Sequence, residues 1–260
     1  MCPSFSIGGF VCSMYALCII GGLALGLGVA LLLSRRRKVP AAEILYTVVF
    51  GAIGAVLGGK LLYLLVNLSP IIALYQTANG WTDVLQFTYA LFSGGFVYYG
   101  GLFGGVAAAC WYCRVFRQPA ALLLPPVITV IPLIHACGRL GCFCAGCCYG
   151  VPYDGPLALT FSHSAFAPAG VALFPVQLLE ALCNLLIFVV LLLAGRNGRR
   201  WQSLFALYLF LYAACRFALE YLRGDTVRGS WLIFSTSQWI SLLIAVAVLL
   251  WLLLRRRQKV

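Results

Sequence analysis

Residues 41–66 read AAEILYTVVFGAIGAVLGGKLLYLLV, an unbroken apolar run in which only Glu43 and Lys60 are charged. A helix of about 20 mostly apolar residues is long enough to cross the hydrocarbon core of a bilayer. The run therefore predicts a membrane-spanning helix, and the rest of the chain has to be interpreted around it.

The whole chain has the composition of a membrane protein. Of its 260 residues, 63% are hydrophobic and 9% are charged, whereas soluble globular domains carry about 25% charged residues. These values exclude a water-soluble globule. We predict an all-α, polytopic protein with seven transmembrane helices in a single integral membrane domain over residues 1–260. The other six predicted spans lie near 7–33, 87–115, 119–140, 174–195, 202–222 and 231–254.

Basic residues predict the orientation of these spans. The net charge is +12, but the bases form short clusters between apolar runs, so we expect no nucleic-acid partner. Thirteen of the 18 Lys and Arg residues follow the first, third, fifth and seventh runs, while the alternate connections carry only Arg223 and Arg228. The positive-inside rule then places the N-terminus outside and the C-terminus in the cytoplasm. No basic cluster precedes the first run, so we expect no cleavable signal peptide.

Three remaining bases, Lys60, Arg139 and Arg216, lie within or at the ends of apolar runs. A base at the centre of a span costs about 2.5–3.5 kcal/mol, which is tolerated mainly where it faces a cavity, a partner or a ligand. The structural alternative is that a long side chain near a span end reaches the headgroup region. Glu180 and Glu220 lie in similar positions, and together these residues favour a polar interior site.

The sixth run carries several polar residues on one face. Tyr212, Arg216, Glu220 and Arg223 are spaced so that they lie along one side of a helix. The spacing fits an internal Arg–Glu pair that neutralises itself. It also fits a guanidinium held for an anionic ligand, because the planar fork of Arg binds phosphate with two hydrogen bonds. Two bases outnumber one acid here, which favours the second interpretation.

Cysteines gather in residues 135–150, HACGRLGCFCAGCCYG. Cys144 and Cys147 form a CxxC motif, with Cys142 and Cys148 nearby. A structural zinc site normally uses two separated ligand pairs, and no second pair is evident, so we predict no metal. A disulfide on the outer face is an open alternative, because that side is oxidising in many compartments.

Taken in order, these motifs resemble the prolipoprotein diacylglyceryl transferase family over nearly the whole chain. The most specific part is Gly138-Arg139-Leu140-Gly141-Cys142-Phe143 through Tyr149-Gly150, which is similar to the family signature around an essential arginine. A second part is similar to the family's late tyrosine and arginine motif, and weaker supports lie around Tyr15, Gly58-Gly59-Lys60 and Gly100-Gly101-Leu102. The second part runs from Leu207-Tyr208 through Tyr212, Arg216-Phe217 and Glu220 to Arg223 and Asp225.

The resemblance implies a multi-pass enzyme of the bacterial inner membrane that needs no cofactor. Such an enzyme transfers a diacylglyceryl group from phosphatidylglycerol to the lipobox cysteine thiol of a prelipoprotein and releases glycerol phosphate. Arg139 and Arg216 suit the lipid phosphodiester and the charge that develops on the leaving phosphate. The resemblance implies Arg139, Arg216 and Tyr99 as catalytic residues, and Tyr15, Lys60, Gly100, Gly101, Tyr212, Glu220 and Arg223 as substrate-binding residues.

The chain departs from the family pattern at some of these positions. The family carries a histidine, implicated in activating the thiol, directly before the Gly-Gly of the third span, where this chain has Tyr99. A free thiol has a pKa of about 8.5, so some activation is expected, and a tyrosine with a pKa of about 10 is a weak base. Cys142 and Cys147 stand where many members have asparagine and glutamate, and Phe174 replaces a further histidine.

Other functions fit parts of the sequence. One is a divergent lipid-group transferase with another acceptor. A second is a membrane thiol redox protein that uses the cysteines between 142 and 148. A third is a transporter in which Lys60, Arg139 and Arg216 line a path for anions. His135 fits a hydrogen-bonded structural role at a helix end better than a catalytic one.

Overall fold

The computed structural model describes residues 4–7, 10–162, 164–196, 198–225 and 230–257. The chain divides into two compact units, residues 1–33 with 128–260 (unit 1) and residues 34–127 (unit 2), and each is described by itself. The described residues form nine α-helices and only short strands, which confirms the all-α prediction. Arg228 and Lys259, two of the bases that predict the orientation, lie outside the described residues.

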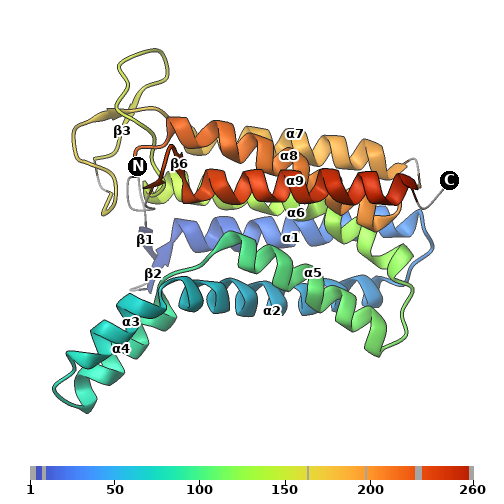
Figure 1. Cartoon of the computed structure of the whole chain (residues 1–260), viewed down its shortest axis with the longest axis horizontal. Coiled ribbons are helices and arrows are strands. Elements are labelled where there is room, and N and C mark those ends of the chain that lie inside the picture. The colour runs from blue at the N-terminus through green and yellow to red at the C-terminus, as the bar shows by residue number, and fades with distance from the viewer. Residues whose placement is uncertain (1–3, 8–9, 163, 197, 226–229, 258–260) are drawn as a thin grey trace. The chain divides into compact units, whose positions relative to one another are not determined.

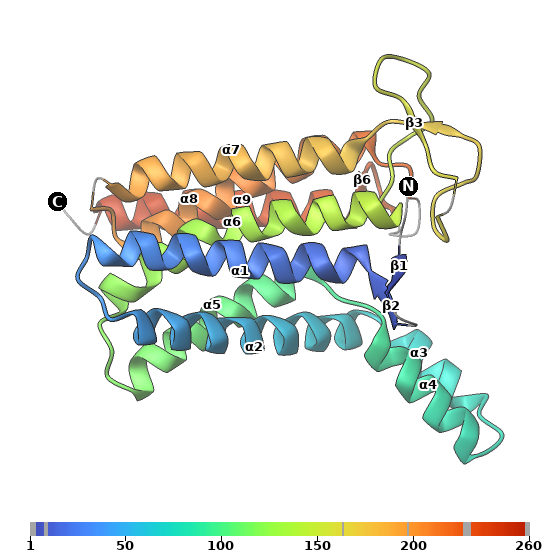
Figure 2. The same cartoon turned by 180° about the vertical axis from the view of Figure 1, so that it is seen from behind.

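Unit 1 is a bundle of helices that run alternately up and down (Figure 1 and Figure 2). It contains most of α1 and α6, all of α7, α8 and α9, and the 3-10 turn η1. Their bounds are α1 Met14–Arg35, α6 Ala120–Ala145, α7 Val176–Arg196, α8 Trp201–Leu219, η1 Glu220–Leu222 and α9 Thr236–Arg257.

Helices α1 and α6 are antiparallel neighbours. Gly141, near the end of α6, lies against Tyr15 at the start of α1. Further along α1, a Cβ added at Gly22 would lie 2.6 Å from Cys137 Cβ, and one at Gly26 would lie 3.8 Å from Val130 Cβ. Residues further along α1 therefore contact residues earlier in α6, so the two helices run in opposite directions.

One end of unit 1 carries three short hairpins and a long loop (Figure 1). Gly150, in the loop between α6 and α7, forms an antiparallel β-bridge with Arg223. The small buried core of this loop consists of Phe161, Ala167 and Leu173. The ends of α6 and α8 and the starts of α7 and α9 meet at this end (Figure 2). The antiparallel pairs are β1 Ser4–Ile7 with β2 Phe10–Ser13, β3 Leu159–Thr160 with β4 Ala172–Leu173, and β5 Ser230–Trp231 with β6 Phe234–Ser235.

Unit 2 is built on a close helix pair. It contains α2 Ala41–Val66, α3 Leu68–Gln76, α4 Trp81–Ser93 and α5 Tyr98–Val115. A Cβ added at Gly58 of α2 would lie 2.9 Å from the Cα of Gly104 in α5, a distance that real Cβ atoms do not adopt. Glycines thus let the two backbones approach. The same helices are tied together by Tyr112, whose hydroxyl donates to Glu43 Oε2 at 2.6 Å.

The third predicted span, 87–115, is wrong as a single helix. The structure ends α4 at Ser93 and begins α5 at Tyr98. Gly95 between them has a φ of +70°, a left-handed conformation that does not continue a helix. The Lys60 ammonium donates to the carbonyls of Leu91 and Gly94 at this break. It thereby satisfies carbonyls that the ending helix leaves open.

The other expected spans correspond to helices with shifted ends. The first and last begin later than predicted, because residues 10–13 and 234–235 pair in hairpins. Helix α6 continues to Ala145, five residues past the prediction. Among the described residues, six helices are long and apolar enough to cross a membrane. They are α1, α2, α6, α7, α8 with η1, and α9, and α5 is not one of them.

Candidate active site

Three elements of unit 1 bring buried charges together around Glu180. Its Oε1 lies 2.9 Å from Arg139 Nη2 of α6, and its Oε2 lies 3.8 Å from Arg223 Nη1. Glu180, on the first turns of α7, is only 2% exposed. Arg223 follows η1 and also donates to both carboxylate oxygens of Asp225, at 2.8 and 2.5 Å. One carboxylate therefore connects the end of α6 to the segment that leaves α8.

Arg216 and Glu220 form a second buried pair at the end of α8. Arg216 Nη2 lies 2.5 Å from Glu220 Oε2 and donates to Ser237 Oγ of α9 at 3.2 Å. Ser235 Oγ donates to Glu220 Oε1 at 2.7 Å. The i, i+4 pair expected from the sequence is thus present, and Ser237 at the start of α9 and Ser235 of β6 each bind one of its members.

The balance of charge differs from the sequence expectation. Arg139, Arg216 and Arg223 are matched by three carboxylates, because Glu180 and Asp225 join Glu220. The expected excess of bases over acids at this place is therefore wrong. Glu180 comes from α7, so its contribution depends on tertiary packing, whereas Asp225 lies only two residues after Arg223.

Hydrogen-bonding capacity remains in this neutral network. Within the described part of the chain, the buried Nη1 atoms of Arg216 and Arg223 have no hydrogen-bond partner, and the 3.8 Å from Arg223 Nη1 to Glu180 is too long for one. Burial alone would lower the pKa of Arg223, but the hydrogen bonds to Asp225 and the nearby negative charges raise it. Arg223 therefore stays charged and able to donate.

A row of aromatic rings begins next to Arg139. Its Nε donates to His135 Nε2 at 3.2 Å. The His135 ring lies 5.1 Å from the ring of Tyr212, which in turn stacks on Tyr208 at 5.9 Å. His135 is therefore hydrogen-bonded within the bundle, as its structural interpretation predicts, and Tyr212 lies in the same layer as Arg139.

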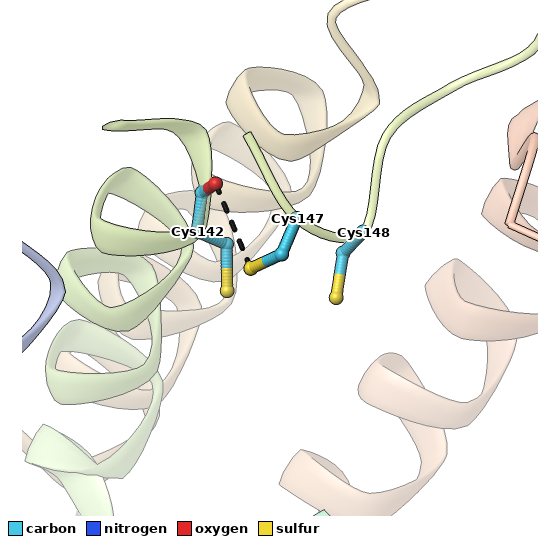
Figure 3. A group of neighbouring side chains, drawn as sticks. All are labelled: Cys142, Cys147 and Cys148. Atoms are coloured by element: carbon cyan, nitrogen blue, oxygen red, sulfur yellow. Dashed lines mark hydrogen bonds between the residues drawn. The ribbon is translucent and has the colours of Figure 1, made fainter. Parts of the chain in front are cut away.

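Three thiols lie directly beyond Arg139. The sulfurs of Cys142, Cys147 and Cys148 are all within 4.8 Å of one another, and Figure 3 shows Cys142 on α6 with the other two on the segment that follows. Hydrogen bonds with Cys142 and Cys147, followed by the charges of Arg139 and Arg223, lower the pKa of Cys148 despite its burial. For Cys147, the hydrogen bond with Cys142 lowers the pKa, but the bond with Cys148 and burial outweigh it and raise the value to about 11.

Comparison with known proteins identifies the family of this chain. A family model described as prolipoprotein diacylglyceryl transferase matches residues 3–254. The phosphatidylglycerol–prolipoprotein diacylglyceryl transferase of Clostridium tetani is 34% identical over 224 residues, which cover 85% of each chain. The protein of that name from Dehalococcoides mccartyi strain 195 is 31% identical over 266 residues, covering 98% of this chain and 94% of its own. The chain belongs to the prolipoprotein diacylglyceryl transferase family.

Membership in the prolipoprotein diacylglyceryl transferase family confirms the resemblance drawn from the motifs. It makes the chain a transferase of lipoprotein biosynthesis and, with its apolar helices, a multi-pass protein of the bacterial inner membrane.

The structure brings one group of the predicted site residues together in unit 1. Arg139, Arg216, Tyr212, Glu220 and Arg223 belong to the charged network or to its aromatic support. Tyr15 lies at the start of α1, with its Cα 3.2 Å from a Cβ added at Gly141, two residues after Arg139.

The other predicted residues of this transferase lie in unit 2. Tyr99, Gly100 and Gly101 occupy the first turn of α5. A Cβ on Gly100 would lie 2.6 Å from Leu62 Cβ, and one on Gly101 would lie 2.5 Å from the Phe96 ring, so both glycines permit close packing. Lys60 binds the carbonyls at the end of α4.

Several network residues were not among the predicted site residues. Glu180 had a usable signal, because it is an acid within an apolar run. Asp225 had only a place in the late motif, two residues after Arg223, and the contact of Ser237 with Arg216 depends on how α8 and α9 pack. The cluster of Cys142 with Cys147 and Cys148 depends on the turn that ends α6.

Proposed function

We propose that the chain transfers a diacylglyceryl group from phosphatidylglycerol to the lipobox cysteine thiol of a prolipoprotein, with Arg139 and Arg216 binding the lipid phosphate. Relatives that carry this reaction in their names support it. The observation that carries the site is the buried Arg216, 4% exposed, whose Nη1 has no hydrogen-bond partner among the described residues. A phosphate oxygen is the partner that such a guanidinium suits best.

The reaction needs charge stabilisation on the leaving phosphate. The acceptor sulfur forms a bond to the terminal glyceryl carbon while the bond from that carbon to the phosphate oxygen breaks. Glycerol phosphate leaves with the electron pair, and the thiol proton passes to a base. Guanidinium groups stabilise the charge on the leaving group without being displaced from their positions. Glu220 and Glu180 then act by holding Arg216 and Arg139, while Arg223 offers a further donor.

Tyrosines complete the proposed site. Tyr212 and Tyr15 each present a phenol near Arg139, where a hydroxyl orients headgroup or phosphate oxygens. Four further residues lie in unit 2 and are proposed to serve the same reaction: Lys60, Tyr99, Gly100 and Gly101. Tyr99 occupies the position where the family carries its histidine.

We expect Tyr99→Phe to reduce transfer about 10²-fold, because its hydroxyl is proposed to act in proton transfer. Tyr98→Phe is the matched control and should leave the rate unchanged, and equal rates for both variants would remove Tyr99 from the mechanism.

We also propose seven spans, which the directions of the helices support. Helices α1 and α6 are antiparallel, so α6 starts on the side where α1 ends, and an even number of spans must lie between them. α2 provides one, which leaves α5 as the other, and we propose that residues 1–260 form one membrane domain with an external N-terminus. Reporter fusions after residues 38, 117 and 260 should all report the cytoplasm. A periplasmic signal from any of them would contradict this topology.

The reaction itself is tested with purified protein in detergent. Phosphatidylglycerol and a lipobox peptide should yield a peptide whose mass has increased by one diacylglyceryl group, together with glycerol phosphate. A peptide with serine in place of cysteine should remain unmodified, because a hydroxyl is a far weaker nucleophile than a thiolate near neutral pH. Failure to modify the cysteine peptide with any phospholipid would overturn the proposed function.

A further inference from the structure

The three clustered thiols are held in place by the backbone around them. Cys147 N donates to Cys142 O at 3.1 Å, and Gln177 Nε2, from the buried start of α7, donates to Cys147 O at 3.0 Å. Gly146 and Cys148 take φ values of +70° and +57°, a conformation that turns the chain sharply and that side chains other than glycine rarely adopt. The turn places Cys147 and Cys148 beside Cys142 (Figure 3).

The far side of this turn is anchored to the charged network. Val151 N donates to Leu222 O and Gly224 N donates to Tyr149 O, each at 3.0 Å. These bonds hold the cysteine turn against the segment that carries Arg223. Arg139 precedes Cys142 by one helical turn on α6. The guanidinium groups of Arg139 and Arg223 therefore both lie near the thiols, an environment that favours anionic sulfur.

Thiolate clusters of this size bind soft metal ions. Zinc bound by thiolates has Zn–S bonds of about 2.3 Å, which in tetrahedral geometry separates the sulfurs by about 3.8 Å. The sulfurs here lie within 4.8 Å, so a contraction of about 1 Å or less is needed, which rotation of the cysteine side chains provides. Three protein ligands leave the fourth position of a tetrahedral ion open, as in catalytic zinc sites.

We propose that Cys142, Cys147 and Cys148 bind one zinc ion whose fourth position takes the acceptor thiol. The second half of this proposal rests on the proposed function, in which the acceptor is a cysteine. Binding to the ion lowers the pKa of the acceptor thiol, so the base of the proposed reaction removes its proton readily and leaves a metal-bound thiolate. The sequence-based prediction of no metal assumed that zinc needs two separated ligand pairs. The turn after α6 instead brings Cys142 together with the adjacent pair Cys147 and Cys148.

The metal site is tested with Co²⁺ as a probe, added to the reduced, detergent-purified full chain after chelation. We expect a sulfur-to-cobalt charge-transfer band that saturates at one ion per chain and disappears when Zn²⁺ is added. Cys142→Ser and Cys148→Ser should each lose most of this band. The matched control is the double variant Cys110→Ser, Cys113→Ser, which removes the CxxC pair of α5 and should keep the band. A wild-type chain with no band, or a band that survives in the Cys142→Ser, Cys148→Ser double variant, would overturn the site.

The open position is tested by adding a lipobox peptide to the Co²⁺-loaded protein without lipid. The charge-transfer band should grow by roughly one third, from three sulfur ligands to four, and the serine peptide should leave it unchanged. An unchanged band with the cysteine peptide would refute acceptor binding at the metal. These spectra do not depend on turnover, so protein that transfers lipid without a cobalt band refutes only the metal site. Protein that binds Co²⁺ but transfers nothing refutes only the proposed function.

Discussion

Arg139→Gln is expected to lower the rate of diacylglyceryl transfer by at least about 10²–10³-fold, the loss seen when a preorganised charge-stabilising donor is removed. Glutamine keeps much of the length of the side chain but removes its charge and its planar fork. In this protein the change also releases Glu180 Oε1 and the hydrogen bond to His135. The measurement is kcat with phosphatidylglycerol and a cysteine lipobox peptide, followed by mass spectrometry of the peptide.

Two further variants show whether the guanidinium itself is needed. Arg139→Lys keeps the positive charge without the fork and should remain well below wild type, because Arg and Lys are not equivalent at a bidentate phosphate site. Arg196→Gln removes a base from the last turn of α7, away from the network, and should leave kcat unchanged. A near-normal rate for a folded Arg139→Gln variant would contradict the proposed role of Arg139.

Glu180→Gln is expected to cost about 3–5 kcal/mol in the free energy of unfolding, as is typical when one member of a buried ion pair is removed. Glu180 is the acid that Arg139 and Arg223 share, and it is 2% exposed. The amide leaves two buried guanidinium groups with one charge fewer to balance them. Denaturant or thermal unfolding of the detergent-solubilised protein measures the loss.

The control for this change is an exposed acid. Asp154→Asn, in the loop between α6 and α7, should change stability by no more than about 0.5 kcal/mol. The double variant Glu180→Gln, Arg139→Gln should lose less than the sum of the two single variants, because it removes both partners of one pair. Equal stability of Glu180→Gln and wild type would mean that the acid does not hold the network together.

Local patterns predicted much of this protein. Long apolar runs located six of the helices, and the i, i+4 spacing predicted the pair of Arg216 with Glu220. Each of these features depends on residues that are near one another in sequence, so the pattern contains the information.

Features that depend on helix packing or on the geometry of turns could not be predicted. Glu180 faces Arg139 only because α7 lies beside α6, so the number of buried acids was underestimated. The third span was expected as one helix because hydropathy does not detect the left-handed backbone at Gly95. Cys142 meets Cys147 and Cys148 through a turn whose geometry depends on Gly146 and on its contacts with Ser164.

The distribution of acids over the helices bears on how the protein is made. The span formed by α8 and η1 contains both Arg216 and its partner Glu220, so it carries its own neutralising charge when it leaves the ribosome. Helix α6 contains Arg139 but no acid, and its partner Glu180 is synthesised only with the next helix. Placing an unpaired arginine in lipid is costly. During synthesis α6 is therefore expected to stay at the insertion machinery until α7 arrives, and the two helices should enter the bilayer as a pair.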